Sequence, residues 1–199
     1  MMLIEETTVP DAALPVDPFK AHLRLGTGFG EDSLQDEVLK GFLRAAIAAI
    51  EARTGKVLIE RGFSWILTGW RDRAGQVLPV APVTDLAQVT LVDALGVETV
   101  LVDGLYRLEA DSQRPRLRPV GAWLPNVATG GEVRISFDAG FASDWGGLPA
   151  DLGQAVLMLA AHYYEYRHET KLGDGCMPFG VTSLIQRYRT VRISFGVGQ

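Results

Sequence analysis

The stretch that decides the fold is residues 33–58, SLQDEVLKGFLRAAIAAIEARTGKVL, in which a helical pattern gives way to a β-branched run. Its apolar residues recur three and four positions apart, as on one face of an α-helix; they are Leu34, Val38, Leu39, Phe42, Leu43, Ala46, Ile47 and Ile50. Asp32 or Ser33 can cap the start, and Gly55 can adopt the left-handed conformation that ends many helices. We therefore predict a helix of about 20 residues, or roughly 30 Å, followed directly by β structure.

Shorter helical patterns flank this stretch on both sides. Asp17-Pro18 predicts a helix over residues 18–25, because Asp can cap it and Pro fits the first helical position. Downstream, the sequence LPAD at 148–151 begins a helix that we expect to continue to about His168, and a short helix is expected near 181–188. The longer of these has a stripe of residues expected to be buried: Leu152, Ala155, Val156, Leu159, Ala160 and Tyr163.

Between the helical zones, residues 56–141 contain short β-branched and aromatic runs. We expect strands at 57–67, around Val89 and Leu91, around Val100 and Val102, at 106–108, at 116–118 and at 133–137. A hairpin turn is expected at 94–96. Prolines confine these strands to short or edge positions; they are Pro79, Pro82, Pro115, Pro119 and Pro125.

The predicted fold class is therefore α+β. A helical core, with two long helices and several short ones, carries an inserted small, mostly antiparallel β region and an extended C-terminal tail. The predicted division is an N-terminal helical part at 1–55, the β region at 56–141, a C-terminal helical part at 142–189 and the tail at 190–199.

Composition excludes several classes of protein. The chain has 199 residues and a net charge of −5, which argues against a DNA-coating protein, because such proteins need excess Lys and Arg. The single cysteine, Cys176, excludes an internal disulfide and fits a reducing compartment. No apolar run approaches the roughly 20 residues of a membrane span, and residues 1–17 lack the basic start and apolar stretch of a signal peptide.

The glycine-rich loop GTGFG at 26–30 does not have the context of a phosphate-binding loop. It follows no strand and no Lys-Ser/Thr pair closes it. Glu31 and Asp32 stand where the helix N-terminus would receive a phosphate, and their charge would repel it. A turn between two helices is the better interpretation.

Other signs of catalysis or metal binding are weak. His162 and His168 lie six residues apart, so a regular helix points them in different directions. The G-x-S-x-G pattern of a nucleophile elbow is absent, and Cys176 has no identifiable partner that would lower its pKa. We expect no enzymatic activity, no metal and no cofactor.

The end of the chain differs in charge from the rest. Arg187, Arg189 and Arg192 occur there without any acidic residue, and apolar residues alternate with polar ones in between. Such a segment fits docking onto an acidic surface or sheet edge of a partner, and it equally fits a last strand of its own domain. The candidate interface residues are Arg187, Arg189, Val191, Arg192, Ile193 and Phe195.

An ordered set of motifs resembles the head–tail connector (adaptor) family of siphophages and the similar adaptors of gene transfer agents. The likeness runs from about Asp17 to Arg189, and its specificity lies in the order and spacing of the pieces. They are KAHLR at 20–24, AA at 45–46, IEARTGKVL at 50–58, DAGF at 138–141, LPADL at 148–152, HYYEYR at 162–167, MPFGV at 177–181 and RYR at 187–189.

This resemblance implies a ring of about a dozen subunits in the particle neck, assembled in the bacterial cytoplasm, with no catalytic residues. The implied partners are the portal protein, a tail-side connector or terminator protein, and DNA that passes through the lumen without sequence-specific contact. An acidic body fits that role, because a basic lining would hold the phosphates. No membrane contact is implied.

Two alternatives stay open. The chain could be another particle completion protein, such as a tail terminator, although the predicted helices favour an adaptor. It could also be a small hydrolase or ligand-binding module, if His162, Glu165 and Cys176 met in one deep pocket.

Overall fold

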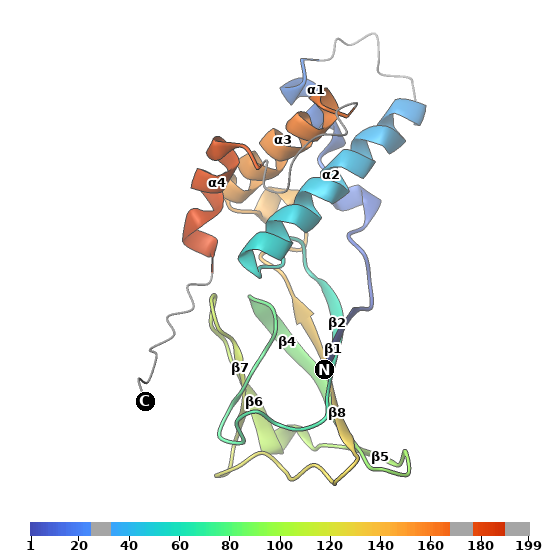
Figure 1. Ribbon diagram of the computed structural model, residues 1–199, viewed down its shortest axis with the longest axis vertical. Coiled ribbons are helices and arrows are strands. Elements are labelled where there is room, and N and C mark those ends of the chain that lie inside the picture. Colours follow the sequence, from blue (N-terminus) through green and yellow to red (C-terminus); the bar gives the residue numbers. More distant parts are fainter. Residues whose placement is uncertain (25–32, 168–176, 190–199) are drawn as a thin grey trace, which may run out of the picture.

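Two hydrophobic cores, one between helices and one between strands, are stacked along the long axis of the molecule (Figure 1). The computed structural model describes residues 1–24, 33–167 and 177–189. The predicted mixed α+β class is confirmed: the described residues form four α-helices and two antiparallel sheets.

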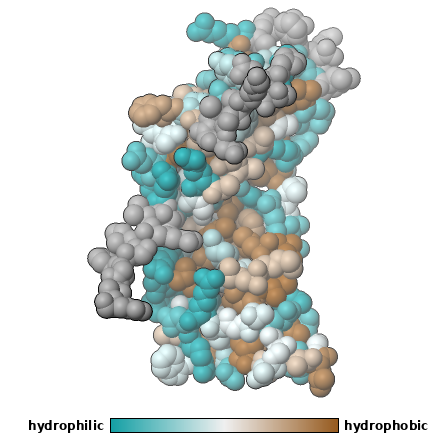
Figure 2. Space-filling view, viewed as in Figure 1, coloured by the Kyte–Doolittle hydropathy of each residue, from teal (hydrophilic) through white to brown (hydrophobic). Residues whose placement is uncertain are grey.

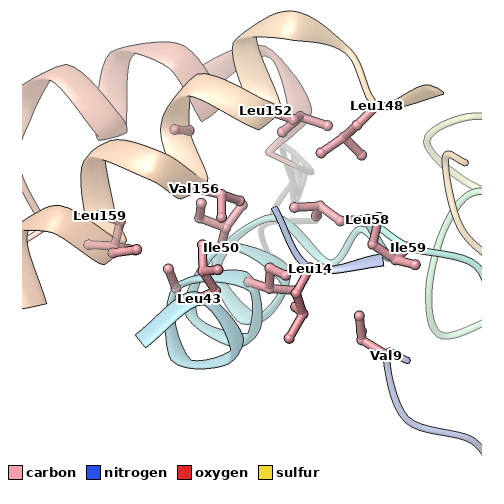
Figure 3. Packing of buried hydrophobic residues seen from close by; sticks show 14 of the residues in the cluster. Val9, Leu14, Leu43, Ile50, Leu58, Ile59, Leu148, Leu152, Val156 and Leu159 are labelled. Atoms are coloured by element: carbon pink, nitrogen blue, oxygen red, sulfur yellow. The ribbon is translucent and has the colours of Figure 1, made fainter. Parts of the chain in front are cut away.

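The helical layer is built on α2 (Ser33–Thr54) and α3 (Ala150–Glu165), with α1 (Val16–His22) and α4 (Phe179–Ile185) packed around them. Short 3-10 turns precede α1 (Asp11–Ala13), precede α3 (Trp145–Gly147) and follow α4 (Gln186–Tyr188). Leu43 and Ile50 of α2 lie toward Val156 and Leu159 of α3, and all four are fully buried (Figure 3). Each such side chain stabilises the fold by about 1.5–3 kcal/mol relative to an exposed one.

The decisive stretch folds as its pattern predicts, with one exception on the apolar face. Gly55 has φ +68° and its N–H donates to the carbonyl of Glu51 at 2.8 Å, which ends α2. Val38 was expected on the buried face, but it is 49% exposed. It is one residue, or about 100° of rotation, away from the buried Leu39, so it lies at the margin of the stripe. The side chain of Leu34 lies outside the described part.

The first helix begins earlier than predicted. Helix α1 starts at Val16, whereas the sequence suggested Pro18 as its first residue. Proline is tolerated two residues into the helix because the first N–H groups of any helix have no intrahelical acceptor. The buried stripe predicted for the helix after residue 148 is confirmed at five of its six positions. Tyr163 is half-buried, and the fully buried ones are Leu152, Ala155, Val156, Leu159 and Ala160.

The main sheet has five strands in the order β1-β2-β8-β4-β5, and every neighbouring pair is antiparallel. Its strands are β1 (Met2–Glu5), β2 (Arg61–Leu67), β8 (Glu132–Ala139), β4 (Val83–Val92) and β5 (Glu98–Val100). A second, three-stranded sheet has the order β3-β7-β6, and its strands are β3 (Gln76–Val77), β7 (Arg116–Pro119) and β6 (Tyr106–Glu109). A 3-10 turn at Asp103–Leu105 precedes β6.

Burial alternates along β8, the central strand. Val133, Ile135, Phe137 and Ala139 are buried, and the residues between them are only partly covered. The buried side chains belong to the same core as Leu117 of the second sheet, and Phe137 stacks on Phe63 with ring centroids 5.7 Å apart. One face of the main sheet therefore packs against the smaller sheet, as in a sandwich.

The structure corrects the sequence-based reading of the β region in three places. Residues 2–5 form an edge strand, although they were assigned to a helical part. Residues 57–60 were expected in a strand, but β2 begins at Arg61 and the preceding residues cross between the layers, with bridges from Lys56 to Ala81 and from Ile59 to Ala142. Val102, expected in a strand with Val100, lies outside β5. The division of the chain at residues 55, 141 and 189 stays a prediction.

Candidate functional site

A buried ion cluster joins the helical layer to the main sheet. Arg61 on β2 contacts Glu51 on α2 (Nη2–Oε2, 2.7 Å) and Glu5 on β1 (Nε–Oε1, 2.7 Å), and its side chain is 7% exposed. Burial lowers the pKa of Arg61, but its hydrogen bonds to Glu51 and Glu5 outweigh that effect and hold the pKa above the ordinary value. Glu51 also accepts the backbone N–H of Leu58 at 2.7 Å. One carboxylate thus holds the end of α2, the crossing segment and β2 together.

An open groove of about 430 Å³ runs beside this cluster, between α2, the N-terminal segment and β2. Its charged lining residues are Arg44, Lys56, Arg61, Glu5 and Glu51. Lys56 is almost fully buried, and its Nζ lies 3.4 Å from the carbonyl oxygen of Gln113. Burial lowers the pKa of Lys56, and the charge of Asp111 opposes this only in part. We interpret the groove as a charged seam between layers, because its carboxylates already bind Arg61.

Exposed apolar side chains also occur in the β layer, outside its core. Seven large ones come from the β4–β5 hairpin, the segment before β6 and the segment after β7: Leu95, Val97, Val100, Val102, Leu105, Val120 and Trp123. Leu95 is 89% exposed and Trp123 is 63% exposed. Where such side chains form a contiguous patch, they commonly mark an interaction surface. We call these seven residues the distal apolar surface.

A second exposed apolar group lies on the opposite edge of the main sheet. Met1, Met2 and Leu3 precede or belong to β1, and all three are exposed. Figure 2 shows hydrophobic surface over the sheet half of the molecule and again at the end where β5 lies. We call Met1, Met2 and Leu3 the β1 edge group. The exposed side chains of the β1 edge group are suited to contacts with another protein.

Comparison with solved structures gives a consistent result. The chain is 55% identical to a protein in the neck of an empty gene transfer agent particle, computed with sixfold symmetry, over 98% of this chain and 99% of that one, with a TM-score of 0.89. A chain in the virion of a native gene transfer agent particle is also 55% identical over the same shares (TM-score 0.86). A chain in the neck of a native gene transfer agent particle, computed with twelvefold symmetry, is 52% identical over the same shares (TM-score 0.84).

The chain belongs to the gene transfer agent head–tail connector family. Identity above 50% over nearly the whole length of both chains leaves no room for a different fold. No family model and no curated protein matches the chain.

The connector's sequence-predicted interface residues fall into two groups. Val191, Arg192, Ile193 and Phe195 lie outside the described residues. Arg189 is exposed at the end of the described chain, and Arg187 is 69% exposed. The interface role of all six stays a prediction.

Arg187 already has intramolecular partners in this connector. Its Nε lies 2.9 Å from Oδ2 of Asp151, and its guanidinium stands over the ring of Tyr188, 4.7 Å from the centroid. Tyr188 in turn donates to Oδ1 of Asp151 at 2.8 Å and packs edge-on against Phe141. The hydrogen bond to Tyr188 raises the pKa of Arg187, which remains charged. These contacts attach the last 3-10 turn to the start of α3.

The residues of the hydrolase alternative are only partly described. His162 is half-buried with its ring 4.7 Å from that of Tyr166, and Glu165 is exposed one turn away. His168 and Cys176 lie outside the described residues, as does the glycine-rich loop. Within residues 1–24, 33–167 and 177–189, no group of three or more His, Cys, Asp or Glu side chains could hold a metal ion. The helices of the same ranges are too short or too polar to cross a membrane.

The ion cluster and the two apolar groups were missed from the sequence. Glu5, Glu51 and Arg61 are far apart in the chain, and nothing in their spacing predicts a contact. The distal apolar surface did leave a signal: apolar residues flank turn residues at Leu95-Gly96-Val97, and Trp123 stands in a segment rich in glycine and proline. Apolar side chains in turns have no core to enter, so they predict a contact outside the subunit.

Proposed function

We propose that this connector is a structural subunit of the neck of a gene transfer agent or phage-like particle, where it forms a ring between the portal and the tail. The observation that carries the proposal is the 55% identity, over 98% of the chain, to a protein located in such a neck. The sixfold and twelvefold symmetry of the related necks supports a closed ring of identical subunits.

The surface of the molecule fits a ring subunit with protein partners better than an enzyme. Its apolar groups lie at the edge and end of a sheet, where they can reach neighbouring proteins. The carboxylates that line its charged groove are bound to Arg61, and the neck relatives are particle components. We therefore assign it no catalytic role.

The net charge of −5 is compatible with DNA passing through the ring. Phosphates bind Lys and Arg with release of counterions, so an acidic ring would let DNA move past it. The partners that we propose are the portal protein on the head side and a further connector or terminator protein on the tail side. The basic segment from Arg187 onward is the proposed portal contact.

Deletion of the gene tests this function. We expect cells without it to accumulate DNA-filled heads that lack tails, and plasmid-borne wild-type protein to restore tailed particles. Normal tailed particles in the deletion strain would refute the proposal. Filled heads alongside free tails of abnormal length would instead favour a tail terminator, the second particle role considered above.

A further inference from the structure

One row of paired residues crosses the main sheet from its edge strand β1 to its edge strand β5. Met2 on β1 pairs with Ile66, Ile66 with Arg134, Arg134 with Thr90, and Thr90 with Val100 on β5. Four strand spacings of about 4.8 Å separate the ends of this row by roughly 19 Å. Because paired residues point to the same side of a sheet, Met2 and Val100 mark opposite edges of one surface.

Both edges expose an apolar side chain at the end of this row. Met2 is 54% exposed, and Val100 is 56% exposed. A free edge invites pairing with another chain unless it is short, charged, interrupted by Pro or covered, and these two edges are short and carry one Glu each. Neither MLIE of β1 nor ETV of β5 contains Lys or Pro. Among the described residues no strand pairs with the outer side of β1 or β5, so both edges can accept a strand of another chain.

The two edge strands differ in sequence, and this difference favours a neighbouring copy in a ring over a twofold partner. A twofold dimer uses the same patch on both subunits, whereas a closed ring joins one patch to a different patch on the next subunit. The β1 edge group and Val100 of the distal apolar surface form such a pair: they are exposed, apolar and on opposite edges of the main sheet. This reasoning rests on the proposed function, because it is the ring that supplies neighbours on two sides.

We propose that the β1 edge group of one copy docks onto β5 and the distal apolar surface of the next copy. The main sheets are then joined head to tail around the ring. The occupant of both edges is a second copy of this chain, and a tail-side protein covering the distal apolar surface is an outcome that the test below separates.

Cysteine cross-linking in particles tests this contact. In a Cys176→Ser background, we would introduce Met2→Cys and Val100→Cys, singly and together, and treat purified particles with a bismaleimide that spans about 10 Å, roughly two strand spacings. The double variant should give a ladder of covalent oligomers on a denaturing gel. Each single variant should give no self-linked product, and co-expression of the two single variants should stop at dimers.

A matched control places the second cysteine elsewhere. Phe179, at the start of α4, is 88% exposed and lies in the helical layer, far from β5 (Figure 1). The pair Phe179→Cys with Val100→Cys should give no ladder. If the Met2 and Val100 variants fail to assemble, Leu3→Cys with Val97→Cys tests the same contact.

The outcomes separate the two proposals. Particles that contain the protein in their necks but give no ladder with either pair would overturn this contact and leave the neck function standing. Covalent dimers from Met2→Cys alone would overturn it too, because they indicate a twofold contact. A link from Val100→Cys to a tail-side protein would assign the distal apolar surface to that protein instead.

Discussion

Arg61 and Glu51 meet through Nη2 and Oε2 at 2.7 Å, and this contact ties the sheet to the end of the longest helix. The Glu51 side chain is 12% exposed and that of Arg61 is 7% exposed, so neither can regain full hydration if its partner is lost. A buried charge without its partner is costly, so we expect loss of either residue to destabilise the junction between the layers.

Glu51→Ala should lower the free energy of unfolding by about 3 kcal/mol, because it leaves the Arg61 guanidinium buried with Glu5 alone. Urea denaturation followed by circular dichroism would measure the change. The control is Glu98→Ala, whose ion pair with Arg134 is exposed on both sides and should be worth about 0–1 kcal/mol. Equal effects of the two substitutions would show that the buried cluster does not hold the layers together.

Lys56→Met should raise the free energy of unfolding at pH 7, because it removes a buried charge and keeps a side chain of similar length. The pKa of Lys56 is lowered in the folded state from 10.5, so the unfolded chain binds more protons between the lowered pKa and 10.5. The wild type therefore gains stability as the pH rises through that window. The difference in the free energy of unfolding between variant and wild type should therefore be smaller at pH 10 than at pH 7. Urea titrations at the two pH values would measure it. A difference that is constant with pH would contradict a lowered pKa.

Gly140→Ala should destabilise the protein strongly. A Cβ at Gly140 would lie 2.3 Å from Cα of Glu60, and backbone atoms there have no room to move apart without breaking the crossing between layers. Gly41→Ala is the control: Gly41 lies exposed on α2 with nothing within 4 Å of an added Cβ, and alanine should stabilise that helix by about 1 kcal/mol. Thermal unfolding should thus move in opposite directions for the two variants.

Tyr188→Phe should cost about 1 kcal/mol of stability, because the hydroxyl that donates to Asp151 is lost while the ring can still pack against Phe141. Tyr166→Phe, on an exposed tyrosine, should have no measurable effect. Unchanged stability in Tyr188→Phe would mean that the last turn is not held through Asp151.

Truncation after Thr190 should leave the melting temperature unchanged and abolish binding to the portal protein, measured by co-purification of the two. The result follows if residues 191–199 dock on a partner and not on their own domain. A truncated protein that unfolds would favour the second interpretation of this segment, a strand of its own core. Arg187→Gln in the full-length chain keeps the segment but also removes the ion pair with Asp151, so its melting temperature is measured together with portal binding.

The sequence predicts the elements whose cause is local. The stripe from Leu39 to Ile50, the helix end at Gly55 and the hairpin turn near Gly96, which has φ +83°, each follow from periodicity or backbone preference. Strand β1 could not be predicted in this way. Four residues without flanking turn signals become a strand only because β2 offers them an edge.

The contacts that join the layers depend on tertiary structure in the same way. Glu5, Glu51 and Arg61 converge only after the sheet and helices have packed, and separations of 10 and 56 residues leave no sequence pattern. The family likeness identified the chain where local rules could not, since it draws on the order of motifs along the whole length.

A cryo-electron microscopy reconstruction of the particle neck tests the central claim most directly. We expect a ring of density between portal and tail into which the two-layer fold of this chain fits, and which disappears from particles made without its gene. An unchanged neck in those particles, or density at that position that fits a different fold, would contradict it.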